Sequence, residues 1–433
     1  MSKPFAHSPN IFWHDTARPC EPSPRLRDKI EQDVVIIGAG FTGLRAAVKL
    51  AEAGSNVTVL DAGDVGWGAS GRTGGQVNPM LPFNGPDQLR KILTPKYFDR
   101  LTEASLNSAD ELFTLIQKYQ IECEARQHGW LRVDHSTGAQ VRSWQAAERW
   151  NDFGAHMTQV DGDELIRLTG TRAYKTGVLA PGGGAVQPLS LARGWARVAR
   201  AAGVSIFGQS DVVDLKRTNG KWTVGTANGH VRADWVIVAT NGYTGDLLPK
   251  LPKTIMPLVP IQIATSPLTE DQIGTILPQG HTISDTRRII MYARREPGNQ
   301  MVFGGLGRMT LGGEIKGHDW LIKDAERIFP QLKGVDWAFR WGGQIAITED
   351  RLPHLHEPQK GLLVGLGYNG RGVAMSHVMG RVMAERVLGA DPGSLSFPVT
   401  AVTPMRWRGT QMIGKGAAVW MMRLLDGLEF RPN

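Results

Sequence analysis

Three glycines and a later acidic residue form the clearest chemical pattern in the chain. Gly38, Gly40 and Gly43 have the G-x-G-x-x-G spacing, and Asp61 follows 18 positions after the last glycine. In such a pattern the glycines allow a tight turn, close approach of a pyrophosphate to the backbone, and packing of a helix on a strand. The acid accepts hydrogen bonds from a ribose. The pattern predicts a dinucleotide site, and the acid argues against the 2′-phosphate of NADP.

The residues around these glycines predict the elements that would hold a dinucleotide. Residues 34–37 and 57–60 are apolar runs of strand length. Between them, apolar side chains recur at helical intervals, at Leu44, Ala47, Val48 and Ala51. Strand, helix and strand make a βαβ unit, in which the helix would point its unpaired N–H groups at the phosphates. The spacing alone does not distinguish NAD from FAD.

The segment that follows Asp61 indicates which of these two cofactors binds. It reads GDVGWGASGRTGGQVNPMLP, which is rich in glycine and has only weak strand or helix signals. A nicotinamide-binding domain would normally continue here into another crossover unit. Backbone this bare instead suits close contact with a second part of the nucleotide, and a flavin has a ribityl chain and a ring beyond the pyrophosphate. We therefore expect FAD.

These motifs also carry a family resemblance. GAGFTGLRAAVKLAEAGSNVTVLDAG followed by GWGASGRTGGQ resembles the D-amino-acid oxidase (DAO) superfamily of FAD-dependent oxidoreductases, in its gamma-glutamylputrescine oxidase-like branch. GGGAVQPLSLARGWARVARAAGVSIF, ADWVIVATNGYTGDLLP and GLLVGLGYNGRGVAMSHVMGRVMAE extend the resemblance over nearly the whole chain. It implies oxidation of a C–N bond in an amine or N-substituted amino acid by hydride transfer to flavin N5. The imine would then hydrolyse, and O2 would reoxidise the flavin to give H2O2.

The motifs and the resemblance together imply a set of cofactor-binding residues. The Val213 backbone would face the adenine, and Ala239 and Thr240 would lie near the pyrophosphate. The complete set is Gly38, Gly40, Phe41, Thr42, Gly43, Asp61, Ala62, Gly68, Ala69, Ser70, Arg72, Gly74, Gly75, Gln76, Val213, Ala239, Thr240, Gly242, Gly367, Asn369, Gly370, Arg371, Gly372 and Val373.

Two parts of this set would surround the flavin itself. In the loop 68–76, Ser70 is expected near phosphate, and Arg72 and Gln76 near the ring. Near the C-terminus, a strand at 362–364 is followed by GLGYNGRGV and a helix from about Ala374 to Val387. The resemblance places the start of this helix at the flavin pyrimidine edge, where Arg371 would reinforce its positive end.

The attachment of the flavin is expected to be noncovalent. Sarcosine oxidases carry a flavin-linked cysteine near the position of Gly343, whereas this chain has no cysteine after Cys123. A histidyl link stays open as an alternative. We expect no metal, because His354, His356 and His377 lack partners at metal-ligand spacing.

The substrate side is less well marked, and no catalytic residue is assigned. The candidates for the pocket wall are Tyr292, Trp341, Tyr368 and Arg351. An aromatic side chain of this kind belongs to the core somewhat more often than to a binding site. Arg351 is the nearest candidate for binding a substrate carboxylate, and it could equally be part of a turn with Asp350.

Several functions stay open at this point. The lysine that many sarcosine-type oxidases place above flavin N5 has no counterpart in MVFGGLGRM. The alternative is therefore a dehydrogenase of a secondary amino acid, of pipecolate, proline or sarcosine type, that passes electrons to a quinone or carrier. The apolar C-terminal segment AAVWMMRLLDGLEF suggests a peripheral membrane contact. A flavin domain for RNA modification is less favoured, since no second catalytic module fits in this length.

The patterns predict an α/β fold with a Rossmann-like FAD-binding domain and a discontinuous α+β cap that contains an antiparallel sheet. The predicted FAD-binding domain comprises residues 30–90, 186–249 and 341–400, and the cap comprises 91–185 and 250–340. Residues 1–29 form an N-terminal tail along the surface, and 401–433 form a C-terminal helical tail.

The composition is that of an ordinary soluble protein. The chain has 433 residues, two cysteines and a formal charge of +8, with its basic residues in scattered pairs. This scatter argues against nucleic acid as a partner. The start of the chain lacks the apolar run of a secretory signal, and we expect a cytoplasmic protein that acts on a small-molecule amine. The sequence does not indicate an oligomeric state.

Overall fold

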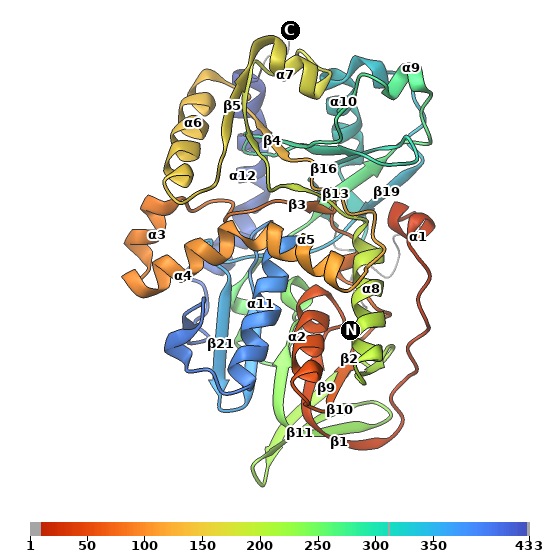
Figure 1. Cartoon of the computed structure of the whole chain (residues 1–433), viewed down its shortest axis with the longest axis vertical. Coiled ribbons are helices and arrows are strands. Elements are labelled where there is room, and N and C mark those ends of the chain that lie inside the picture. Colours follow the sequence, from red (N-terminus) through yellow and green to blue (C-terminus); the bar gives the residue numbers. More distant parts are fainter. Residues whose placement is uncertain (1–9, 311, 431–433) are drawn as a thin grey trace.

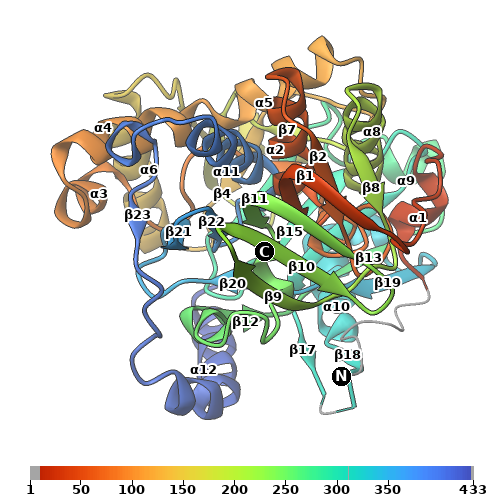
Figure 2. The same cartoon turned by 90° about the horizontal axis from the view of Figure 1, so that it is seen from below.

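The computed structural model describes residues 10–310 and 312–430. The chain folds around two large sheets, which occupy the lower and upper halves of Figure 1. The first has nine strands in the order β23-β21-β22-β11-β1-β2-β8, with β10 and β9 extending it from β11 (Figure 2). These strands are β1 (Lys29–Ile37), β2 (Val57–Leu60), β8 (Ser205–Phe207), β9 (Val212–Thr218), β10 (Lys221–Thr226), β11 (His230–Val238), β21 (His354–Gln359), β22 (Leu362–Leu366) and β23 (Val399–Thr400).

Parallel pairing joins β8, β2, β1, β11 and β22 at the centre of this sheet. Val34 and Ile36 of β1 contribute to the core on one face, and Val35 and Ile37 contribute to the core on the other. Burial on both faces explains the continuous apolar run in the sequence. Three helices cover the first face (Figure 1): α2 (Phe41–Glu52), α8 (Pro188–Ala201) and α11 (Gly372–Val387).

The second sheet has eight strands in the order β19-β13-β16-β15-β14-β4-β6-β5, and its pairings are antiparallel except for β4 with β14. These strands are β4 (Trp130–Val133), β5 (Thr158–Asp161), β6 (Thr176–Ala180), β13 (Pro260–Ala264), β14 (Thr282–Asp285), β15 (Tyr292–Arg295), β16 (Met301–Leu306) and β19 (Phe339–Gly342). Apolar side chains of α7 (Gly162–Thr169) and α10 (His318–Ile328) share its core. The predicted fold class, a parallel sheet joined to a part with an antiparallel sheet, is confirmed.

The remaining elements lie outside the two large sheets. Three small two-stranded ladders are β3 (Gln76–Val77) with β7 (Gly184–Ala185), β12 (Met256–Leu258) with β20 (Ile345–Ile347), and β17 (Arg308–Met309) with β18 (Ile315–Lys316). The remaining helices are α1 (Phe12–Thr16), α3 (Pro86–Ile92), α4 (Pro95–Leu106), α5 (Ser108–Lys118), α6 (Thr137–Asn151), α9 (Glu270–Ile273) and α12 (Arg408–Glu429). The 3-10 turns are η1 (Ala69–Gly71), η2 (Asn241–Tyr243), η3 (Leu251–Thr254), η4 (Pro330–Leu332) and η5 (Pro392–Ser394).

Two segments are placed differently from the expectation. Helices α4 and α5 lie in the range predicted for the cap, yet their apolar side chains belong to the same core cluster as α2 and α11. The predicted surface tail contains α1, whose Phe12 and Trp13 are buried against Trp341. Residues 1–9 of that tail lie outside the described part. The division into two domains stays a prediction.

The C-terminal helix α12 packs on the second sheet through its last turn. Asp426 is buried and accepts hydrogen bonds from the Arg288 side chain at 3.0 Å and the Ile289 N–H at 2.8 Å. Its other side exposes large apolar residues, namely Trp420, Met421, Leu424 and Leu428. Across the described residues, we find no helix with the length and apolar character needed to cross a membrane. Residues 431–433 of the predicted C-terminal tail lie outside the described part.

Candidate functional site

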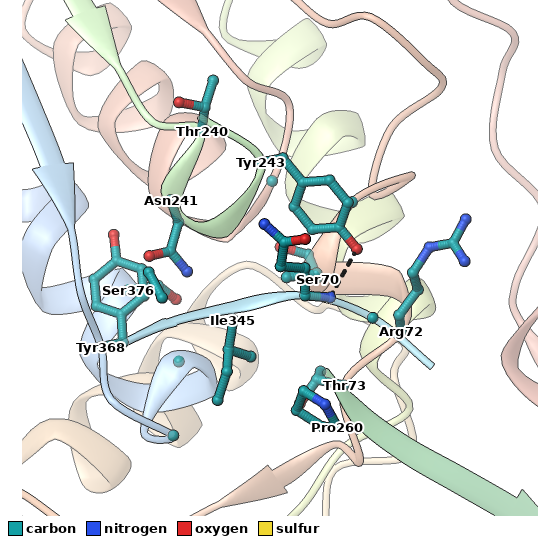
Figure 3. A pocket seen from close by; sticks show the side chains of 18 of the residues that line it. Ser70, Arg72, Thr73, Thr240, Asn241, Tyr243, Pro260, Ile345, Tyr368 and Ser376 are labelled. Carbon is teal, nitrogen blue, oxygen red and sulfur yellow. Dashed lines mark hydrogen bonds between the residues drawn. The ribbon is translucent and has the colours of Figure 1, made fainter. Parts of the chain in front are cut away.

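A cavity of about 1130 Å³ lies between the two sheets. The carboxyl ends of β1, β2 and β11 line one side, and residues of β4, β13, β14 and β15 line the other. Figure 3 shows part of this space, with Ser70, Thr240, Tyr243 and Tyr368 around it. Open parallel sheets bind ligands outside the carboxyl ends of their strands. The volume exceeds the roughly 300–1,000 Å³ of ordinary small-molecule pockets, so a dinucleotide has room.

Most of the predicted cofactor residues line this cavity. They are Gly38, Gly40, Phe41, Thr42, Asp61, Ala62, Gly68, Ala69, Ser70, Arg72, Gly74, Gln76, Val213, Ala239, Thr240, Asn369, Gly370, Arg371, Gly372 and Val373. The other four predicted glycines, Gly43, Gly75, Gly242 and Gly367, are not part of its lining. They allow close packing beside it: a Cβ on Gly43 would stand 2.0 Å from the Gly38 carbonyl oxygen.

Two glycines in the turn between β1 and α2 lie where a side chain would have no space. Gly38 has a φ of +116°, which favours glycine, and a Cβ there would stand 2.8 Å from the Ala239 carbonyl oxygen. A Cβ on Gly40 would meet the Ser70 Oγ at 2.8 Å. That hydroxyl accepts a hydrogen bond from the Phe41 N–H at 3.0 Å. The following N–H groups of the first turn of α2 have no acceptor within the helix, so they are available to an anionic ligand.

Asp61 holds the loops at the end of β2. Its carboxylate accepts hydrogen bonds from the Ala39 N–H at 2.7 Å and the Gly63 N–H at 2.8 Å. Because Ala39 lies inside the glycine turn, these bonds join the acid to the predicted pyrophosphate site. Asp61 lines the cavity, as a ribose ligand requires.

The glycine-rich loop is fixed by contacts to the second sheet. The Gln76 Nε2 donates to the carbonyl oxygens of Ile283 at 3.1 Å and Ala293 at 3.0 Å. A Cβ on Gly74 would stand 2.6 Å from the Tyr292 ring, so the ring lies directly against the backbone. The Arg72 Nε donates to the Trp67 carbonyl oxygen at 3.0 Å, and burial lowers the Arg72 pKa.

The start of α11 forms the opposite end of the site. Asn369 and Gly370 have φ values of 53° and 96°, and the helix begins at Gly372, two residues before the predicted start. The Arg371 Nε donates to the Met80 carbonyl oxygen at 3.2 Å, and its guanidinium lies 4.5 Å from the Trp130 ring centroid. Burial lowers the Arg371 pKa.

Two of the four wall candidates line the cavity. Burial raises the pKa of Tyr292 to about 12, and its hydroxyl accepts a hydrogen bond from the Gln262 Nε2 at 2.8 Å. The Tyr368 hydroxyl lies 2.6 Å from the Thr42 Oγ1, and burial raises its pKa as well.

The other two wall candidates do not line the cavity. Trp341 is fully buried against Phe12 and Trp13, and its Nε1 donates to the Arg72 carbonyl oxygen at 3.0 Å. Arg351 is exposed, and its guanidinium lies 5.3 Å from the Phe83 ring centroid. It makes no ion pair with Asp350, whose carboxylate instead lies 3.0 Å from the His354 Nε2. Trp341 packs in the core and Arg351 lies in an exposed turn, so the structure does not bring either side chain to the cavity wall.

Sequence reasoning missed several cavity residues. Gln262 lies between two buried isoleucines of β13, and its Oε1 has no hydrogen-bond partner among the described residues. Trp130 and Arg132 lie on β4, and Tyr243 lies on η2. A polar residue within an apolar strand was the available signal for Gln262 and Arg132, but it does not indicate which face of the sheet meets a ligand.

Comparison with known proteins identifies the family. Residues 33–386 match the DAO family, described as FAD dependent oxidoreductase. The chain belongs to this family. Among its relatives, Gamma-glutamylputrescine oxidoreductase of Escherichia coli (strain K12) is 31% identical over 380 residues, which cover 87% of this chain and 88% of the relative. Probable oxidoreductase OrdL of Haemophilus influenzae (strain ATCC 51907 / DSM 11121 / KW20 / Rd) is 32% identical over 396 residues, covering 89% and 90%.

Solved structures of the DAO family share the fold. The glycine oxidase structure from Geobacillus kaustophilus has a TM-score of 0.73 at 20% identity and covers 87% of this chain and 99% of that chain. The chain is thus an FAD-dependent oxidoreductase that acts on carbon–nitrogen bonds of amines or amino acids. The residues present fit FAD, because the β1–α2 turn excludes side chains, the first turn of α2 has free N–H groups, and the cavity continues to the start of α11.

Proposed function

We propose that this DAO-family protein oxidises the C–N bond of an extended amine of the gamma-glutamylputrescine type. The observation that carries the proposal is one continuous cavity that joins the glycine turn to the polar wall of β13 and β15. The relative at 31% identity that is named for such a substrate supports it. Bound FAD supplies the hydride-acceptor chemistry, and the protein positions the amine and excludes water.

The ADP part of the cofactor is assigned to the glycine turn and to Asp61. The loop 68–76 would cover the middle of the FAD molecule, and the start of α11 would lie against the flavin ring. Helices α2 and α11 both begin at the cavity, so the positive ends of their dipoles face it. The start of α2 suits the pyrophosphate, and the start of α11 suits the electron-rich part of the ring.

Noncovalent attachment is supported by the cavity lining. Within the described part of the chain, the lining contains no cysteine and no histidine, so it offers no side chain for a thioether or a histidyl link. Cys123 is buried elsewhere, and burial raises its pKa to about 12, which keeps the thiol protonated.

Gln262 and Tyr292 are proposed to position the substrate nitrogen. The Gln262 Oε1 is a buried acceptor that receives no hydrogen bond from the described residues, and a buried acceptor costs free energy until it receives one. An amine N–H would supply that bond. Tyr292 stays neutral near pH 7, because its pKa is about 12, so it acts as a hydrogen-bonding group and not as a base.

The test is a substrate panel on the purified protein loaded with FAD. We expect γ-glutamylputrescine to be oxidised with release of ammonia and an aldehyde, ahead of putrescine, sarcosine, proline and pipecolate. A preference of at least tenfold in kcat/KM for a secondary amino acid over every extended amine would contradict the proposal.

The electron acceptor is measured in the same assay. We propose O2, so that one H2O2 forms per amine oxidised. The exposed apolar side of α12 favours a second candidate, a dehydrogenase that gives electrons to a quinone at a membrane surface. Turnover that needs added quinone and yields no H2O2 would establish that second function instead.

A further inference from the structure

A second, smaller chamber adjoins the main cavity. Its volume is about 210 Å³, and it lies between α6 and the segment 81–85. Both spaces are lined by Pro82, Phe83, Arg132 and Thr286, so Arg132 stands at the boundary between them. Apolar side chains, including Leu81 and Trp150, form other parts of the chamber wall. The chamber therefore has space for a short chain with one charged end.

Arg132 is a cation whose acidic neighbour, Asp134, attracts it electrostatically without a direct ion pair. Among the described residues it has no hydrogen-bond acceptor and no ion-pair partner, although burial lowers its pKa. The neighbouring Asp134 is engaged by the hydroxyls of Ser143 and Thr176. Partial burial removes water from a guanidinium, and without a partner this desolvation destabilises the folded protein. An anionic ligand would offset that cost.

Two other arginines of the cavity differ from Arg132, because carboxylates neutralise them. Arg287 forms ion pairs with Asp285 and Asp324. Arg288 forms ion pairs with acidic residues of α12. These two side chains are neutralised by the protein itself and offer little to an anion.

Arg371 adds a second unneutralised cation on the same side. It donates to a backbone carbonyl and lies over the Trp130 ring, and no carboxylate of the described chain pairs with it. Trp130 and Arg132 are two apart on β4, so they lie on the same face of the sheet. Burial lowers the pKa of Arg371, and repulsion from Arg132 lowers it further. An anion near both would relieve this repulsion.

A carboxylate suits this position better than a larger anion. A guanidinium binds a carboxylate through two parallel N–H···O bonds, and a chamber of about 210 Å³ with both polar and apolar side chains in its wall has room for this small anion. The amine end of the same molecule would remain in the main cavity beside Gln262.

We propose that Arg132 binds a carboxylate at the far end of the substrate, remote from the C–N bond that is oxidised. This inference rests on the proposed function and narrows it to amines that carry an acyl chain with a terminal acid. Arg132 is thus a specificity residue that lowers KM and leaves the chemical step unchanged.

The experiment compares two amines in the FAD-loaded enzyme. N-glutarylputrescine ends in a carboxylate, and N-pentanoylputrescine has a neutral chain of the same carbon number. We expect Arg132→Met to lower kcat/KM for the acid about 100-fold through KM and to leave the neutral amine within about twofold, as for loss of a charge-assisted hydrogen bond. Arg132→Lys should retain part of the preference. Arg149→Met is the control, because Arg149 lies on α6 in an exposed ion pair with Asp87.

The ratio between the two amines is internal to each variant and does not depend on how much of it folds. An unchanged ratio in Arg132→Met and Arg132→Lys would overturn the inference. Calorimetric titration with N-butylglutaramate, which has the carboxylate and no oxidisable amine, gives a readout without turnover. Binding to the wild type that is lost in Arg132→Met supports the site even if neither amine is oxidised, in which case only the proposed function fails. Equal affinity, or no binding to the wild type, contradicts the site.

Discussion

Gly38 and Gly40 show how this site depends on what the residues lack. Both lie where an added Cβ would come within 2.8 Å of a neighbouring oxygen, and only Gly38 also has a left-handed φ. This part of the site could be predicted from the sequence, because the G-x-G-x-x-G spacing expresses a local backbone requirement. The position of Gln262 in the cavity could not be predicted, because it depends on how the two sheets are placed against each other.

Gly38→Ala is expected to weaken FAD binding at least tenfold. An alanine at a φ of +116° is strained by about 1–2 kcal/mol, and its Cβ would push the Ala239 carbonyl out of place. The measurement is a titration of the apoprotein with FAD. Gly245→Ala is the matched control, since Gly245 also lines the cavity but has open space around it. Equal FAD affinity of both variants would count against the assignment of the turn.

Gln262→Leu is expected to lower kcat/KM for the amine about tenfold while FAD affinity stays the same. The leucine removes the acceptor that we assign to the substrate nitrogen, and one hydrogen bond to a polar or charged group accounts for about 1–2 kcal/mol. Gln159→Leu, on the exposed side of β5, serves as the control and should have no effect. If Gln262→Leu matched the control, Gln262 would have only a structural role.

Tyr292→Phe is expected to leave the shape of the pH–rate profile unchanged between pH 6 and 10. The Tyr292 pKa is about 12 because the ring is buried, so the hydroxyl stays protonated over this range. The profile is recorded as kcat/KM against pH for both proteins. Loss of an inflection in the variant would show that Tyr292 exchanges a proton in the reaction.

The elements differ in how far local sequence determines them. Residues 34–37 and 57–60 were predicted as strands and lie in β1 and β2. The Asn219–Gly220 turn between β9 and β10 has φ values of 52° and 83°, as its residue types indicate. Helix α1 was missed as a packed element, because five residues carry little periodicity and their burial depends on partners on β19 and α8.

Helix α12 gives a prediction about element docking. Asp426→Ala should lower the free energy of unfolding by about 2–3 kcal/mol, because it leaves the Arg288 guanidinium and the Ile289 N–H without this partner. Denaturant unfolding of the FAD-loaded protein measures the change. Glu314→Ala removes an exposed ion pair with Lys316 and should change the value by no more than about 0.5 kcal/mol. Similar effects of the two substitutions would mean that α12 is not held by Asp426.

At the scale of the whole molecule, the two sheets enclose the cavity and neither could form it alone. The sequence predicted both sheets, since each has its own periodicity. It did not place Trp341, which has the residue type expected of a pocket wall but is surrounded by Phe12 and Trp13 from the start of the chain. Contacts between residues more than 300 positions apart leave no local pattern in the sequence. The sequence therefore could not show whether Trp341 belongs to the core or to the pocket wall.

The absorbance spectrum of the purified protein tests the central claim most directly. We predict flavin bands, release of free FAD when the protein is denatured, and bleaching of those bands when γ-glutamylputrescine is added without oxygen. A protein that takes up no FAD, or whose bound FAD keeps its bands with every amine supplied, would contradict the account.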